Sequence, residues 1–275
     1  MIYQQAGFES SHGYNWCADR PNQAGSKYIQ ESITIMHLYF IRHAQSENNA
    51  LWAETNSTEG RSHDPELTPM GEEQARLLAG YFQVSQINAG QAAQIYPFPR
   101  PARLTHVYCS LMVRAVATGD VLARAVGLPL VGMLDIHETG GIYQRDPQSG
   151  EKAGLPGPGK AFFAEHYPNL VLPESMNPHG WWNRPFEEPD ELPARARRVI
   201  EYILARHGGT DDRIALISHG GFYDKFLKTL LGMQTGIEFW FTLNNTGITL
   251  IHFSEEVVQM AYSNRIDFLP DRLIT

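Results

Sequence analysis

The chain has 275 residues, of which 43% are hydrophobic and 19% are charged, and its formal net charge is −8. This composition is typical of a globular protein with enough apolar material for a full core. The acidic balance argues against non-specific nucleic-acid binding, which needs clustered Lys and Arg. It does not exclude a small anionic substrate, because the local field of a pocket can oppose the net charge.

The two cysteines, Cys17 and Cys109, lie far apart and have no partner motif, so neither a disulfide framework nor a cysteine-based zinc site is expected. No apolar run is long enough to cross a membrane, and we expect no membrane partner. Residues 1–35 are polar and lack the apolar region of a signal peptide, which predicts a flexible N-terminal extension and a cytoplasmic protein. Met36 stands directly before the first convincing strand.

Apolar runs and helical periodicity divide the rest of the chain into alternating strands and helices. Strands are predicted at 37–42, 104–109, 129–136, 213–218, 247–253 and 257–262. Helices are predicted from Pro69 to Phe82, with Thr68 as the N-cap, and at 112–126, 191–206 and 221–232. Residues 86–103 show no periodicity and are expected to form a loop.

This alternation predicts a three-layer α/β/α domain over residues 36–275, with a mainly parallel central sheet. Residues 139–190 interrupt the pattern with many Gly, Pro and aromatic residues. So long an irregular stretch inside a compact domain is usually a functional lid or cap.

Three polar segments follow predicted strands, at the edge where ligands bind in parallel sheets. Arg42 and His43 lie at the end of the predicted strand 37–42. Arg114 lies in the first turn of the helix that follows the strand 104–109, and His219 follows the strand 213–218. Gly220 and the next glycine begin a helix whose N-terminus favours anions. Two imidazoles and two guanidinium groups around one anion are therefore expected.

Five segments, in this order, resemble motifs of the phosphoglycerate mutase-like, or histidine phosphatase, superfamily. They are Arg42-His43-Ala44-Gln45-Ser46-Glu47-Asn48-Asn49, Leu67-Thr68-Pro69-Met70-Gly71-Glu72-Glu73-Gln74-Ala75, Ser110-Leu111-Met112-Val113-Arg114-Ala115-Val116-Ala117-Thr118, Ser218-His219-Gly220-Gly221 and Asn245-Thr246-Gly247. The resemblance spans about residues 37–253 and implies the phosphoglycerate mutase-like fold.

The resemblance also implies roles for single residues. His43 is the expected nucleophile, and Arg42, Arg114 and His219 are expected to hold the phosphoryl oxygens. Glu138 falls where the family places its acid/base carboxylate. The remaining expected phosphate contacts come from Asn49, the N–H group of Gly220, and Ser46, which alternatively caps a short helix.

Elementary chemistry agrees with these roles. A nucleophilic imidazole must be neutral, and neighbouring Arg charges disfavour its protonated form. Two guanidinium groups match the geometry of phosphate and stabilise charge on its oxygens in the transition state. The scheme needs no metal and no cofactor, and no metal-ligand spacing is visible in the sequence.

Other local interpretations stay open. The family usually has Gly where Ala44 stands, and a positive φ there would strain Ala by roughly 1 kcal/mol. Ser110 is expected to cap its helix, with a place in the pocket as the alternative. Trp181 and Trp182 are expected to fasten their loop, with a lid over the substrate as the alternative.

We therefore expect a metal-independent phosphomonoester hydrolase that acts on a small phosphorylated molecule through a phosphohistidine. A cofactor-dependent phosphoglycerate mutase is the alternative enzyme. A catalytically inactive scaffold that binds phosphorylated ligands is less well supported, because all five expected catalytic residues are present. The sequence does not name the substrate and leaves open whether the chain forms a homodimer.

Overall fold

The computed structural model describes residues 34–87, 103–233 and 238–275, and residues 34–275 belong to one compact unit. The expected extension over 1–35 and the expected loop over 86–103 fall almost entirely outside these ranges. Among the helices described, none is both long and apolar enough to cross a bilayer.

The core of the unit is a seven-stranded sheet in the order β6-β3-β2-β7-β1-β8-β9. Its strands are β1 (Met36–Arg42), β2 (His106–Ser110), β3 (Leu130–Met133), β6 (Leu170–Val171), β7 (Arg213–Ser218), β8 (Ile248–Phe253) and β9 (Val258–Arg265). The neighbours from β6 to β1 pair in parallel, whereas β8 is antiparallel to β1 and β9 is antiparallel to β8. The predicted mainly parallel sheet is confirmed.

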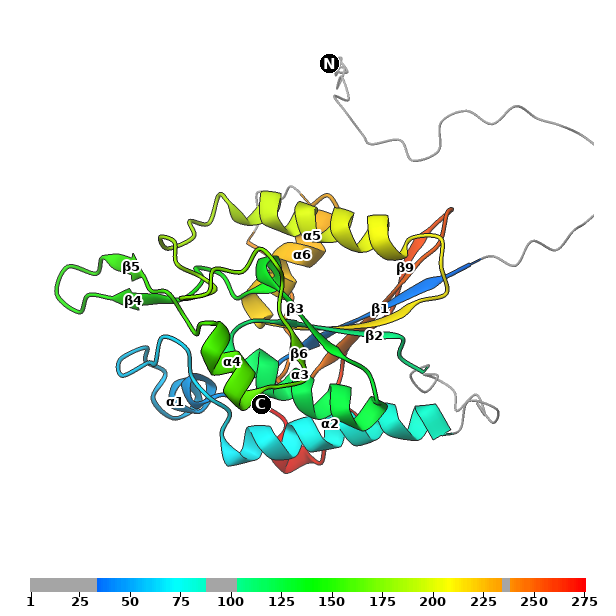
Figure 1. Ribbon diagram of the computed structural model, residues 1–275, viewed down its shortest axis with the longest axis horizontal. Coiled ribbons are helices and arrows are strands. Elements are labelled where there is room, and N and C mark those ends of the chain that lie inside the picture. The colour runs from blue at the N-terminus through cyan, green and yellow to red at the C-terminus, as the bar shows by residue number, and fades with distance from the viewer. Residues whose placement is uncertain (1–33, 88–102, 234–237) are drawn as a thin grey trace, which may run out of the picture. The chain divides into compact units, whose positions relative to one another are not determined.

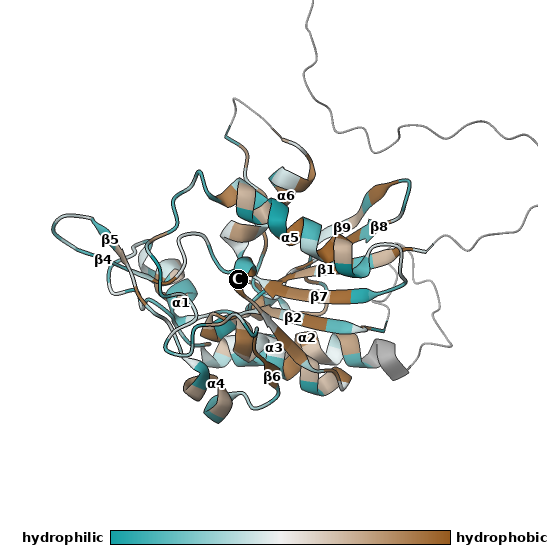
Figure 2. Ribbon diagram, turned by 45° about the horizontal axis from the view of Figure 1, so that its top comes forward, coloured by the Kyte–Doolittle hydropathy of each residue, from teal (hydrophilic) through white to brown (hydrophobic). Residues whose placement is uncertain are grey.

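Helices cover both faces of this sheet (Figure 1). On one face lie α2 (Pro69–Ile87) and α3 (Val113–Val126), and on the other lie α5 (Leu192–His207) and α6 (Gly220–Leu230). The central strands are mostly hydrophobic along their length (Figure 2), because both of their faces are covered. Each face has its own apolar cluster, so the three-layer prediction is confirmed.

The segment 139–190 has more regular structure than its sequence indicates. It contains a hairpin of β4 (Tyr143–Arg145) and β5 (Lys152–Gly154), the short helix α4 (Lys160–His166) and β6. Because β6 pairs in parallel with β3, part of the segment extends the main sheet. The hairpin projects on the side of the molecule that carries α1 (Glu47–Thr55), the short helix that the sequence left as one alternative for Ser46.

The third predicted strand is shorter than expected. It ends at Met133 and continues as a 3-10 turn over Leu134–Ile136. This turn carries the chain toward His137 and Glu138. Because β1, β2 and β7 are parallel neighbours, the residues that follow them, the expected site residues included, lie at one edge of the sheet.

Candidate active site

His43 directly follows β1, and its environment fixes which ring nitrogen carries the proton. The backbone N–H of His43 donates to the carbonyl oxygen of Ser218 at 2.9 Å. Its Nδ1 lies 2.6 Å from the carbonyl oxygen of Ala44. Because a carbonyl oxygen only accepts, Nδ1 carries the hydrogen, and the lone pair of the neutral ring is on Nε2.

The loop after His43 is held from three sides. The N–H of Ala44 donates to Thr118 Oγ1 at 3.0 Å, and the N–H of Gln45 donates to Gln74 Oε1 at 2.7 Å. Asn245 Nδ2 donates to the carbonyl oxygen of His43 at 2.9 Å. Ala44 is not among the residues with positive φ, so alanine causes no strain there.

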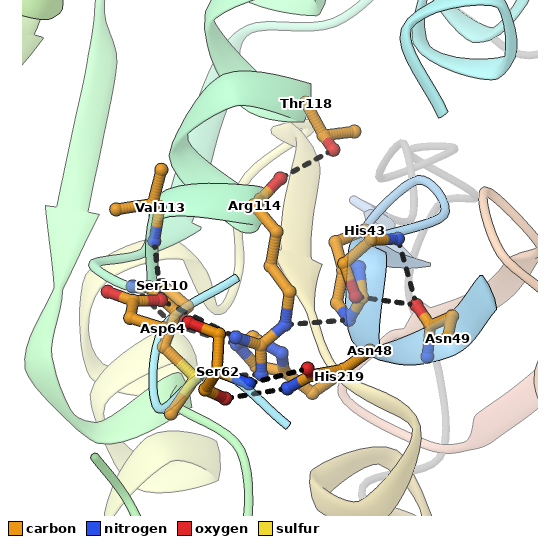
Figure 3. Close-up of polar contacts among 12 residues, drawn as sticks. His43, Asn48, Asn49, Ser62, Asp64, Ser110, Val113, Arg114, Thr118 and His219 are labelled. Carbon is orange, nitrogen blue, oxygen red and sulfur yellow. Dashed lines mark hydrogen bonds and ion pairs between the residues drawn. The ribbon is translucent and has the colours of Figure 1, made fainter. Parts of the chain in front are cut away.

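Arg114 brings its guanidinium against Nε2 of His43, the ring nitrogen that holds the lone pair. It lies in the first turn of α3, and its Nε donates to His43 Nε2 at 3.1 Å, as Figure 3 shows. Its Nη1 lies 3.5 Å from Oδ1 of Asp64. The side chain is buried, so its charge acts on His43 without much screening by water.

His219 lies beside His43, as expected, with 5.0 Å between the ring centroids. Its Nε2 is 2.9 Å from Ser110 Oγ, and its buried Nδ1 has no hydrogen-bond partner among the described residues. Ser110 therefore lines the site. The prediction that it caps α3 is wrong, because the chain turns into the helix later and Met112 is the N-cap.

Arg42 completes the expected set of basic groups. Its Nη1 donates to the carbonyl oxygen of Leu243 at 2.7 Å. Its buried Nε has no hydrogen-bond partner in the described part of the chain. A Cβ added to Gly220 would lie 3.6 Å from that Nε, so the start of α6 and Arg42 are immediate neighbours.

Glu138 lies at the N-terminus of α6. Its Oε1 accepts hydrogen bonds from the N–H groups of Thr139 at 2.8 Å and Phe222 at 3.0 Å, and its Oε2 accepts one from Gly221 at 3.2 Å. The carboxylate is thus oriented by three backbone donors. It also acts electrostatically on both Arg42 and Arg114, which places it within reach of the same centre.

The electrostatics favour a neutral imidazole at His43. Burial lowers the pKa of His43 well below its ordinary value, and the charges of Arg114 and Arg42 lower it further. The pKa of His219 is also well below its ordinary value, first because of burial and then because of Arg114. Both imidazoles are therefore uncharged at neutral pH.

Asn49 and Ser46 contact each other, and the sequence had left open whether Ser46 caps a helix or contacts phosphate. The N–H of Ser46 donates to Asn49 Oδ1 at 3.1 Å, and Ser46 Oγ lies 3.0 Å from the same atom. Ser46 is the N-cap of α1. Asn245 Nδ2 also donates to Asn49 Oδ1, at 3.2 Å, so both residues brace the loop that carries His43.

The profile of the histidine phosphatase superfamily (branch 1) matches residues 38–90 and 85–265. The chain belongs to this superfamily. It is 27% identical over 241 residues to "Putative phosphoserine phosphatase 2" of Hydrogenobacter thermophilus, covering 83% of this chain and 95% of that protein.

Two solved structures show the same fold. One is a phosphoserine phosphatase from Entamoeba histolytica in complex with phosphoserine (TM-score 0.51, 19% identity, covering 86% of this chain and 100% of that one). The other is a mycobacterial glucosyl-3-phosphoglycerate phosphatase in complex with VO3 (TM-score 0.51, 18% identity, covering 84% and 99%).

Asp64 also belongs to the site, although the sequence did not indicate it. Its Oδ1 accepts a hydrogen bond from the N–H of Val113 at 3.1 Å and faces Arg114 (Figure 3). Burial raises the pKa of Asp64 to about 7, more than the attraction of Arg114 and the N–H group of Val113 lower it. The carboxyl group therefore titrates near neutral pH while touching the guanidinium that contacts His43.

A second residue that the sequence did not indicate supports the loop of Glu138. Arg195, on α5, is almost fully buried and forms a two-point ion pair with Glu187, with distances of 2.5 and 2.7 Å. Its Nη1 donates to the carbonyl oxygens of Asp135 at 2.7 Å and His137 at 3.0 Å. The ion pair thus fixes the backbone on both sides of the turn that leads to Glu138.

Two tryptophans of the 139–190 segment pack against the loop that carries His137 and Glu138. Trp181 and Trp182 are both buried, and the Trp182 ring meets His137 edge-on at 4.6 Å. A Cβ on Gly141, where φ is +74°, would overlap the Trp182 ring, so this packing needs glycine. These contacts agree with the interpretation that the pair fastens its loop.

Proposed function

We propose that this protein is a phosphomonoester hydrolase that acts through a phosphohistidine on His43. One observation carries the proposal: buried nitrogens with no hydrogen-bond partner among the described residues lie beside a neutral imidazole whose lone pair is on Nε2. They are Arg42 Nε, which is an N–H donor, and His219 Nδ1, which carries the hydrogen of the neutral ring when His219 Nε2 accepts from the Ser110 hydroxyl. Buried donors normally have partners, and a phosphoryl group supplies acceptor oxygens for both.

In the first step, His43 Nε2 attacks phosphorus, and the bond between phosphorus and the substrate oxygen breaks. Arg114 Nε now occupies the lone pair of Nε2, so we infer that an incoming phosphoryl oxygen takes over this donor. Arg42, Arg114, His219 and the N–H of Gly220 then stabilise the charge that spreads over the equatorial oxygens. The leaving oxygen takes a proton from Glu138.

In the second step, water attacks the phosphorus atom of the phosphohistidine. Glu138 accepts a proton from this water, the bond between phosphorus and Nε2 breaks, and phosphate leaves. The hydrogen bonds from the start of α6 hold the Glu138 carboxylate in place for both transfers. The role of acid and base thus falls to one oriented group.

The proposed scheme uses no metal and no cofactor. The positive charge at the phosphoryl group comes from two arginines, the half-buried Arg42 at the end of β1 and the buried Arg114 of α3. Forked guanidinium donors match the oxygens of a phosphoryl group, so the charge demand of the transition state is met by side chains.

We propose a small phosphorylated molecule as the substrate, with the 139–190 segment as the lid that contacts its leaving group. The names of the relatives make phosphoserine and phosphoglycerate derivatives the first natural compounds to test. Exposed Lys152 and Arg184 lie in this segment, at 3.9 Å from the Phe186 ring centroid and 4.2 Å from the Trp182 ring centroid. They are candidates to meet a second charged group of such a substrate.

The decisive experiment is hydrolysis of a generic aryl phosphate with EDTA present, for the wild type, His43→Ala and the control His166→Ala. His166 is an exposed histidine on α4. We expect phosphate release by the wild type and the control, and none by His43→Ala. Quenching in an alkaline denaturant should trap a labelled phosphoenzyme, stable in base and labile in acid, in the same two proteins. The proposal would be refuted if folded wild type released no phosphate and gave no trapped phosphoenzyme. A trapped phosphoenzyme together with phosphoglycerate mutase activity would instead favour the mutase.

A further inference from the structure

A second group of polar side chains lies at the opposite end of the same strands. His106 is the first residue of β2, Asp212 directly precedes β7, and His207 is the last residue of α5. The active site follows the carboxyl ends of β2 and β7, so this group lies at their amino ends. The group is thus separated from His43 by the length of the strands.

The possible ligand atoms of these three residues converge on one point. His207 Nδ1 lies 2.8 Å from Asp212 Oδ2, and His106 Nδ1 lies 3.6 Å from Asp212 Oδ1. All three side chains offer a ligand atom within 4.8 Å of the other two. Around a tetrahedral zinc ion, ligand atoms at about 2.0–2.2 Å from the metal are roughly 3–3.5 Å apart. The observed spacing needs only a small contraction.

The surroundings of the group can also support a metal. His207 is buried, and its Nε2 lies 3.0 Å from the hydroxyl of Tyr108. If Nδ1 binds a metal, the proton of the neutral ring moves to Nε2, and the Tyr108 oxygen can accept it. Such a hydrogen bond from the second nitrogen is the usual way in which a metal-binding His is oriented.

Thr105 allows the same change at the other imidazole. Its hydroxyl lies 2.9 Å from His106 Nδ1 and 3.2 Å from both Asp212 Oδ1 and the carbonyl oxygen of Arg213. The hydroxyl can therefore release His106 and still donate a hydrogen bond. The exposed Arg206 acts electrostatically on His106 and hydrogen-bonds with the Tyr108 side chain, so a bound metal ion has to tolerate this neighbouring positive charge.

We propose that His106, His207 and Asp212 form a binding site for a divalent transition metal of the zinc type. Two imidazole nitrogens and one carboxylate oxygen favour such ions over Mg²⁺ and Ca²⁺, which prefer oxygen ligands alone. His106 and Asp212 are partly exposed, so the fourth position faces water. The bound ion ties the end of α5 to the starts of β2 and β7 and should therefore stabilise the folded chain.

The test is titration of Zn²⁺ into untagged, EDTA-treated and desalted protein, followed by calorimetry and thermal unfolding. We expect one saturable site in the wild type, and a rise in Tm on adding Zn²⁺. The partly exposed ligand His106 is changed in His106→Ala, which should weaken binding by at least about tenfold and abolish the rise in Tm. Co²⁺ in place of Zn²⁺ should give the visible absorption of a tetrahedral site in the wild type only.

Two further variants separate this site from the active site. His43→Ala should keep the zinc site, and His166→Ala, which removes an exposed histidine of α4, should also bind as the wild type does. Absence of saturable binding in the wild type, or equal zinc affinity in His106→Ala, would overturn the inference. Because these readouts do not involve phosphate release, they stand or fall independently of the proposed phosphatase activity.

Discussion

Arg114 donates its Nε–H to Nε2 of His43 at 3.1 Å, so a buried cation lies on the lone pair of the proposed nucleophile. This contact has two effects. It opposes protonation of the ring, because a second positive charge there would be repelled. In the proposed mechanism it also marks the place of a phosphoryl oxygen, since the same donor must find a new acceptor when His43 attacks.

The first prediction concerns pH. The pKa of His43 is well below 6.5, because of burial and the charges of Arg114 and Arg42. A lowered pKa means that the ring stays neutral and nucleophilic when the pH falls through 6.5. The rate of phosphoenzyme formation should therefore not decline between about pH 7 and about pH 5.5, where an ordinary imidazole becomes protonated.

Rapid-quench measurements with two aryl phosphates of different phosphate pKa check this prediction, because they separate ionisation of the substrate from that of the enzyme. An acid limb near pH 6.5 with both substrates would contradict it.

The second prediction concerns Gly221. A Cβ at this position would lie 2.4 Å from Glu138 Oε1, so Gly221→Ala must displace the carboxylate. We expect kcat to fall by about 10²-fold, the lower range for loss of an acid/base group. With a good leaving group that needs no proton, hydrolysis of the phosphoenzyme becomes the slow step, and phosphoenzyme should accumulate.

Gly80→Ala is the control, because a Cβ on this helical glycine meets no atom within 4 Å. Equal kcat in Gly221→Ala and Gly80→Ala would show that Glu138 is not displaced or not needed.

The third prediction concerns the buried pair of Arg195 and Glu187. Removal of one partner leaves an uncompensated buried charge, so Arg195→Met should lower the free energy of unfolding by about 3–5 kcal/mol. The double variant Arg195→Met/Glu187→Leu replaces the pair by apolar groups and should recover most of that loss. It still lacks the donors to the carbonyl oxygens of Asp135 and His137, so kcat should stay reduced.

Urea unfolding and steady-state kinetics on the same samples separate these two effects. If kcat recovers together with stability in the double variant, the pair has no positioning role.

The fourth prediction concerns Asp64. Burial raises its pKa from 3.8 to about 7, so the folded protein holds this proton more tightly than the unfolded chain does. For a carboxyl group with a raised pKa, stability is present below the unfolded value and is lost as the pH rises toward the folded value. Asp64→Asn cannot ionise, so it should lose less stability than the wild type between about pH 5 and about pH 8.

Urea unfolding at both pH values measures the difference, with the exposed Asp190→Asn as a control. Equal pH dependence in the wild type and Asp64→Asn would show that Asp64 does not titrate in this range.

The fold and the centre of the site could be predicted because the signals are local. His43, Arg114 and His219 each follow a strand in a short motif, and parallel pairing of those strands brings their ends together. Asp64 could not be found this way, because it lies in a segment without periodicity and meets Val113 only through the path of the folded chain. The sequence of α5 gave no sign that Arg195 is buried.

The start of α3 shows that sequence signals do not place a helix boundary to the residue. A serine after a strand indicates an N-cap, yet two more residues pass before α3 begins, and Ser110 contacts His219 instead. The proposed zinc ligands are invisible in the sequence for a related reason. His106 lies about a hundred residues from His207 and Asp212, so no ligand spacing exists to be recognised.

The hydrogen bond from His43 Nδ1 to the Ala44 carbonyl oxygen has a consequence for the chemical identity of the proposed intermediate. Phosphohistidine exists as two regioisomers, and this contact blocks one of them before any substrate arrives. The backbone of the next residue, and not the substrate, therefore selects the τ isomer. Any residue that replaces Ala44 can preserve this choice, provided that it keeps the carbonyl group where it is.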